Sequence, residues 1–163
     1  MHPTNHPDPS LFLNLMLILA FLVPAVFFVL TQQNTLRTVR KENRRMLPGL
    51  VWLQFIPFFG QIWQFFVVIR IASSAVRQRL SFREDSILGL ADGAAEDIGK
   101  RPTLTMGIIY CTLFAINTLY LFTTINPTTE TIHGVVALVQ TVCWIIYWIQ
   151  LTALKRKLKR SGQ

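Results

Sequence analysis

Apolar residues along this chain gather into four long runs, and the charged residues all lie between or beyond them. The runs cover residues 11–30, 50–69, 104–125 and 135–154. Each is about 20 residues long, and a helix of that length rises far enough to cross the roughly 30 Å hydrocarbon core of a bilayer. A soluble domain of 163 residues would not carry four such runs. The pattern therefore predicts an all-α integral membrane protein.

The second run is irregular at its centre, where it reads "IPFFGQIWQFF". Pro57 lacks a backbone N–H and disfavours a continuous helix, and Gly60 permits turn conformations that other residues avoid. A turn inside a bilayer leaves backbone groups without partners. The amides of Gln54, Gln61 and Gln64 are close enough in sequence to satisfy them. This run is predicted to be either a re-entrant hairpin or a kinked transmembrane helix.

The distribution of positive charge distinguishes these two arrangements. Of the 16 Lys and Arg residues, five lie in residues 31–49, six in residues 70–103 and five after residue 154. Four crossings would divide them five against eleven between the two faces of the membrane. A hairpin places all of them on one face, as the positive-inside rule expects for the cytoplasmic face.

We therefore predict a helical bundle of three transmembrane helices plus a re-entrant hairpin, with four transmembrane helices as the alternative. The N-terminus is expected outside and the C-terminus in the cytoplasm. The chain is predicted to form a single membrane domain. Its parts are a transmembrane helix at 11–30, a basic cytoplasmic loop at 31–49, the hairpin or kinked helix at 50–71, a cytoplasmic connection at 72–102, transmembrane helices at 103–125 and 133–154, and a basic tail at 155–163.

The net charge of +8 comes from clusters that lie directly beside apolar runs. Clusters in this position are typical of contacts with anionic lipid headgroups rather than with nucleic acid. The residues expected to make these contacts are Arg44, Arg45, Lys155, Arg156, Lys157, Lys159 and Arg160.

Small residues recur at a spacing of four in the third run, at Gly107, Cys111 and Ala115. This spacing places them on one face of a helix, where a second helix can approach closely. We expect this face to pack against a membrane protein partner or against another copy of the chain.

Chemical motifs are lacking throughout the sequence. No Asp, Glu, Lys or Arg interrupts any apolar run, whereas proton relays and ion-coupled transporters need such groups inside the membrane. The sequence also carries no zinc-protease, nucleophile-elbow or phosphate-loop motif. We predict that the protein is not an enzyme and uses no cofactor or metal.

Two segments resemble a family of small bacterial integral membrane proteins of unknown function. They are "LPGLVWLQFIPFFGQIWQFFVVIRIASS" and "CWIIYWIQLTALKRKL", and the glycine-rich acidic stretch "ADGAAEDIGK" is also similar. The resemblance implies a bacterial inner membrane protein and implies no activity.

The functional expectation is an accessory subunit, scaffold or homo-oligomer. The alternative is a pore or carrier for a small neutral or lipid-like solute, because broken helices near the membrane midplane often form solute sites. In that case Gln54, Gln61 and Gln64 are expected to line the site beside the break at Pro57 and Gly60.

Overall fold

The computed structural model describes residues 9–85, 103–120 and 127–160, and these form helices joined by short connections, without a strand. The predicted all-α class is thus confirmed for these residues. The elements are α1 Pro9–Thr38, the 3-10 helices η1 Lys41–Asn43 and η2 Pro48–Phe55, then α2 Phe59–Asp85, α3 Leu104–Tyr120 and α4 Pro127–Arg160.

Three helices are long and apolar enough to cross a membrane: α1, α2 and α4. Helix α3 has 17 residues in its described part, which is the lower end of the range for a crossing. The set differs from the prediction, which placed spans at 11–30, 103–125 and 133–154. The difference has two parts: α3 is described only to Tyr120, and α2, which falls in the run predicted as a hairpin or a kinked transmembrane helix, continues to Asp85.

The helices extend beyond the predicted spans into the predicted basic segments. α1 continues to Thr38, inside the segment 31–49, and α4 continues through the basic cluster of 155–163 to Arg160. The predicted connection 72–102 is helical up to residue 85, and residues 86–102 lie outside the described part, as do 121–126 and 161–163. Helices extend beyond the apolar runs because lysine, arginine and glutamine are good helix formers in water.

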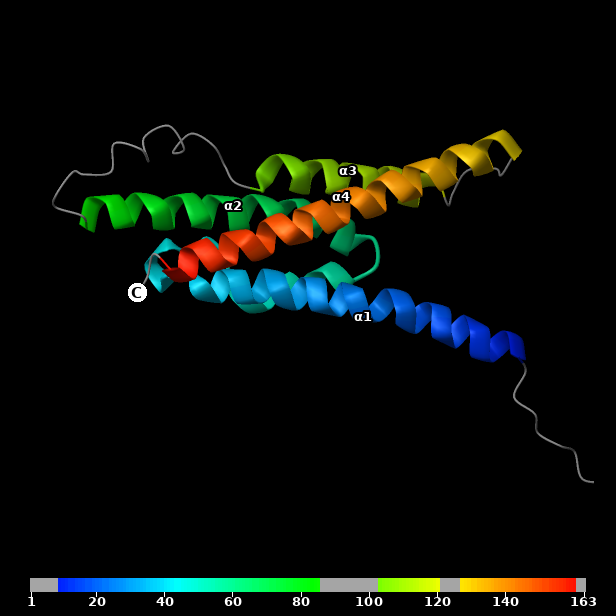
Figure 1. Ribbon diagram of the computed structural model, residues 1–163, viewed down its shortest axis with the longest axis horizontal. Helices are drawn as coiled ribbons and strands as arrows, with labels where there is room; N and C mark the ends of the chain where they lie inside the picture. The colour runs from blue at the N-terminus through cyan, green and yellow to red at the C-terminus, as the bar shows by residue number, and fades with distance from the viewer. Residues whose placement is uncertain (1–8, 86–102, 121–126, 161–163) are drawn as a thin grey trace, which may run out of the picture.

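The helices enclose a core by forming a closed ring of contacts. Along this ring α1 packs on α4, α4 on α3, α3 on α2, α2 on η2, and η2 on α1 again. Figure 1 shows the chain reversing direction between η2 and α2 part-way along α1, on which both elements pack. The short η2 therefore closes the ring between α2 and α1.

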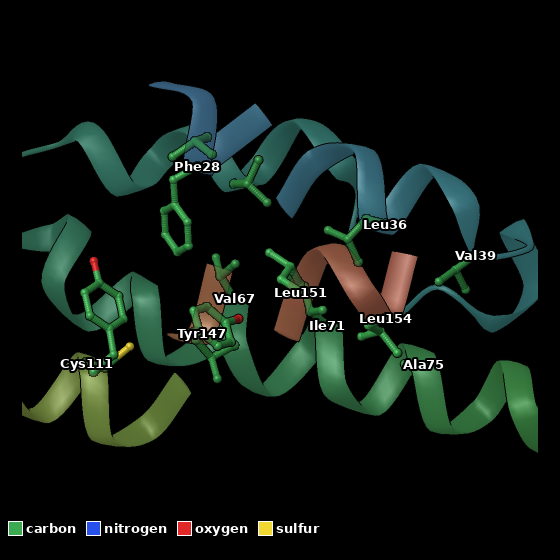
Figure 2. Close-up of a cluster of buried hydrophobic side chains, with 14 of the residues drawn as sticks. Phe28, Leu36, Val39, Val67, Ile71, Ala75, Cys111, Tyr147, Leu151 and Leu154 are labelled. Carbon is green, nitrogen blue, oxygen red and sulfur yellow. The ribbon is translucent and has the colours of Figure 1, made fainter. Parts of the chain in front are cut away.

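Aromatic side chains organise the centre of this ring. The Phe28 ring of α1 makes edge-to-face contacts with Tyr110 of α3 and with Trp144, Tyr147 and Trp148 of α4. Such contacts have a preferred geometry and so fix how the helices are rotated about their axes. Figure 2 shows the core continuing from Phe28 toward Leu36 and Val39 of α1, past aliphatic side chains of α2 and α4.

Helix α3 approaches α2 and α4 closely at a glycine. A Cβ atom on Gly107 would lie 2.4 Å from Cγ1 of Val68 and 3.0 Å from Cε2 of Tyr147. Cys111, one turn further along, is also buried, and Ala115 is half-buried. The small-residue face thus packs against helices of the same chain, at least at Gly107, rather than being left open for another copy.

We predict that Gly107→Leu destabilises the single chain. Overpacking a filled interior costs about 1–3 kcal/mol, and here both neighbours are held by the core. The thermal unfolding midpoint in a mild detergent should therefore fall. Gly134→Leu is the matched control, because nothing lies within 4 Å of a Cβ atom on Gly134. An equal fall in both variants would contradict the close packing at Gly107.

Candidate functional site: a glutamine-lined cleft beside the chain reversal

The chain reverses direction between η2 and α2 in only three residues. Phe59 donates its backbone N–H to the carbonyl of Pro57 at 2.7 Å, and Gly60 donates to the carbonyl of Ile56 at 2.7 Å. Phe58 carries the left-handed conformation, with φ 61°. A non-glycine residue in this region is strained by about 1–2 kcal/mol, so the surrounding packing must hold it. We expected Gly60 to supply the turn conformation, and the structure places that conformation at Phe58.

Gly60 has a different role, which is to allow close approach of two backbone segments. A Cβ atom at this position would lie 2.1 Å from the backbone oxygen of Gln54 and 2.7 Å from its carbonyl carbon. Neither atom belongs to a flexible side chain that could move aside. Any larger residue would therefore push α2 away from η2.

Hydrogen bonds place both ends of this hairpin at the same end of the bundle. The backbone N–H of Arg45, just before η2, donates to Oγ of Ser74 at 2.9 Å. The backbone N–H of Arg40 donates to Oε1 of Gln78 at 2.8 Å, and Asn43 donates to Oγ of Ser81 at 2.8 Å. Residues 40–45 and the second half of α2 are thus adjacent, so the chain returns to the level from which η2 started.

A cleft of about 340 Å³ lies beside the reversal. It is bounded by all four α-helices and by the end of η2, and most of its wall is aromatic or aliphatic. Phe21 and Phe55 remain exposed at its rim. The residues that line it are Phe21, Ala25, Phe28, Val29, Gln54, Phe55, Gln64, Tyr110, Phe114, Gln140, Thr141 and Trp144.

Three glutamines give this apolar cleft its polar character. Gln54 is held in place, because its Nε2 donates to Oε1 of Gln32 at 2.6 Å and to the Val51 carbonyl at 2.9 Å. The other two are different: Oε1 of Gln64 and Oε1 of Gln140 are both buried without a hydrogen-bond partner among the described residues. A buried polar atom without a partner costs about 1–3 kcal/mol, so the cleft offers two acceptor oxygens that a hydrogen-bond donor could satisfy.

The structure gathers only part of the predicted polar cluster. Gln54 and Gln64 line the cleft, whereas Gln61 is half-buried and does not line it. The prediction that Gln61 is a lining residue is therefore wrong. Residues three apart lie only about 60° apart around a helix, and this offset leaves Gln64 buried and Gln61 half-buried. Gln140 was missed, although it is one of only two glutamines in the apolar run 135–154.

Arg44, which was expected to contact lipid headgroups, instead donates hydrogen bonds to backbone carbonyls of the same chain. Its Nε donates to the Val39 carbonyl at 2.9 Å and its Nη2 donates to the Arg37 carbonyl at 2.9 Å. These are carbonyls at the C-terminal end of α1, where a cation interacts favourably with the helix dipole. None of the remaining residues of that predicted set is buried. Lys155 is half-buried, and the exposed residues are Arg45, Arg156, Lys157, Lys159 and Arg160.

No family model, curated protein or solved structure matches this chain. The resemblance to small bacterial membrane proteins therefore stays a prediction. In residues 9–85, 103–120 and 127–160 no group of three His, Cys, Asp or Glu side chains could hold a metal ion. The cleft is accordingly characterised by its own geometry alone.

We predict that Gly60→Ala destabilises the protein by at least about 2 kcal/mol, because a backbone segment rather than a side chain must move. The free energy of unfolding in detergent provides the measurement. Gly49→Ala is the matched control at the start of the same hairpin, since nothing lies within 4 Å of a Cβ atom there. The two changes restrict the unfolded chain equally. A Gly60→Ala variant as stable as Gly49→Ala would show that the two segments do not touch.

Proposed function

We propose that the protein crosses the membrane with α1, α3 and α4, and that η2 and the first half of α2 form a re-entrant hairpin. Two of the residues beside the hairpin tip, Phe55 and Gln64, line one cleft with Ala25 and Gln140. Ala25 and Gln140 lie near the middle of α1 and α4. If these long helices cross a bilayer, the tip lies close to its midplane.

The polar second half of α2 supports the same arrangement. Ser74 and Gln78 bond with the segment that follows α1, and Figure 1 shows the end of α2 near the ends of α1 and α4. The clusters at Arg37–Arg45 and Lys155–Arg160 gather at this end, which the positive-inside rule assigns to the cytoplasm. The resemblance noted in the sequence favours a bacterial inner membrane.

We predict that cysteines placed at Glu42 and Arg77 react with a membrane-impermeant maleimide from the same face, and that one at Glu130 reacts from the opposite face. Cys111 and Cys143 are first replaced by alanine. Glu42 and Glu130 are exposed, as is Arg77, so burial does not limit labelling. Labelling of Glu42→Cys and Arg77→Cys from opposite faces would establish a complete crossing by the second apolar run.

For the activity, we propose that the cleft binds a neutral, lipid-like solute that carries a hydroxyl group. The observation that carries this proposal is the pair of unpartnered buried oxygens, on Gln64 and Gln140, in one apolar cleft. A hydroxyl can donate one hydrogen bond, to the oxygen of one of these glutamines, and can accept another from the amide N–H of the second. The exposed rim at Phe21 and Phe55 offers entry from the hydrocarbon.

A neutral ligand fits because no Asp, Glu, Lys, Arg or His lines the cleft. A charged ligand in such a site would lose its hydration without gaining a counter-charge. The aromatic walls match an apolar body, and pockets of about 300–1,000 Å³ are the usual size for small-molecule sites. A carrier or binding role therefore has more support here than the role of accessory subunit.

Assembly with a partner stays a prediction, but the surface proposed for it is no longer the Gly107 face. The Gly107 face is filled by Val68 and Tyr147 of the same chain. The exposed apolar part of α1, residues 11–23, is the surface that remains for a partner helix or for lipid. Cross-linking from this part of α1 would identify which of the two covers it.

We predict that a diazirine-bearing diacylglycerol in phosphatidylcholine vesicles photolabels the cleft, with adducts near Phe21 on α1 and Trp144 on α4. Gln64→Leu combined with Gln140→Leu should lower this labelling about thirtyfold, since two hydrogen bonds of about 1 kcal/mol each are lost and about 1.4 kcal/mol is a factor of ten. The same double variant should be at least as stable as the parent, because it removes two unpartnered oxygens.

Gln61→Leu is the matched control, as it removes an amide from the same helix outside the cleft. Its labelling should equal that of the parent protein. Adducts spread evenly over the lipid-facing helices, or an equal loss in Gln61→Leu, would contradict a specific site.

A further inference from the structure

A second concave surface lies on α4, away from the glutamine cleft, and it differs from that cleft in charge. It is a groove of about 590 Å³ at the basic end of the helix. Its apolar part is formed by Trp148, Ile149 and Ala153. Its polar part is formed by Thr152, Arg156, Lys157 and Arg160, and no acidic side chain lines it.

Two indole rings indicate the depth of this groove in a membrane. Nε1 of Trp148 donates to Oγ1 of Thr31 at 3.0 Å, and Nε1 of Trp52 donates to Oε1 of Gln33 at 3.3 Å. Both contacts lie where α1 changes from apolar to polar residues. Tryptophan prefers the level between hydrocarbon and headgroups, so the apolar part of the groove faces acyl chains and its basic part faces headgroups.

The positive charges in the groove lie on one face of the helix. Arg156 and Arg160 are four residues apart, and both are exposed. Like charges at this spacing repel one another, and an anion between them removes that cost. Helical side chains lean toward the helix N-terminus, which brings these guanidinium groups nearer to Trp148. Arginine also binds phosphate oxygens in a fork geometry that favours two parallel hydrogen bonds.

We propose that this groove is a binding site for one anionic phospholipid, with the phosphate held by Arg156 and Arg160 and an acyl chain lying along Trp148 and Ile149. The alternation of an apolar and a basic part along one helix face matches an amphipathic lipid better than it matches a free phosphate ion, which would leave the apolar part uncovered. Site binding of this kind is distinct from the general attraction of a basic tail to an anionic surface, which depends on net charge alone.

The test titrates the purified full-length chain, in a neutral detergent, with phosphatidylglycerol that carries brominated acyl chains. Quenching of tryptophan fluorescence reports binding, because Trp148 lies in the groove. Brominated phosphatidylcholine is the headgroup control and should quench only at much higher concentration.

The groove variant Arg156→Gln, Lys157→Gln, Arg160→Gln is compared with a matched variant, Arg45→Gln, Lys155→Gln, Lys159→Gln. Both remove three charges from the same end of the molecule, and the second set does not line the groove. General attraction contributes about fivefold per charge and would weaken both equally. We expect the half-saturating concentration to rise at least tenfold more in the groove variant than in the matched variant.

Equal losses in the two variants would overturn the site, leaving only general attraction. Displacement of the lipid by millimolar inorganic phosphate would also overturn it, because the groove would then be a phosphate site without a role for the acyl chain. Circular dichroism of both variants checks that the helices are intact. If the lipid site on α4 is overturned, the proposal for the glutamine cleft still stands, since the two sites share no lining residue.

Discussion

The close approach of Gly60 to the backbone of Gln54 is the constraint on which the rest of the structure depends. It lets the chain reverse within three residues, so that η2 and α2 lie side by side rather than forming one long helix. The reversal leaves η2 as the element that closes the ring between α1 and α2. It also brings Phe55 and Gln64 to the same cleft and returns α2 to the segment that follows α1.

Polar side chains are used sparingly in this apolar fold, and most have defined partners. Trp63 donates to the Leu50 carbonyl at 2.7 Å, and Gln78 accepts from the backbone of Arg40. These bonds satisfy backbone groups that the irregular segments would otherwise leave open, at a cost that is high away from water. Five buried side-chain oxygens of the described residues lack a partner, and of these only those of Gln64 and Gln140 line the cleft, which is why the cleft rather than the hairpin itself is the candidate site.

The two proposed ligand sites lie at different positions along α4. The glutamine cleft is uncharged and lies near the middle of α1 and α4, whereas the groove on α4 has arginines at one end. A neutral solute and an anionic lipid would therefore bind at different levels without competing. The helix-packing motif at Gly107 serves neither site directly, but it holds α3 against α2 and α4 and so keeps Tyr110 and Phe114 on the cleft wall.

The sequence by itself determined the helical class, the apolar segments and the interruption near Pro57, because run length, proline and glycine act locally. It also singled out Gln54 and Gln64. It did not locate the helix ends, since α1, α2 and α4 continue past their apolar runs. Only the tertiary structure decided that Gln140 joins the site and Gln61 does not, that Phe58 adopts the left-handed conformation, and that Arg44 caps α1. The lining of the cleft depends on how one helix is rotated against another, and residues far apart in the chain set that rotation through the rings around Phe28. The turn at Phe58 and the cap at Arg44 depend on backbone conformations that residue type alone does not fix.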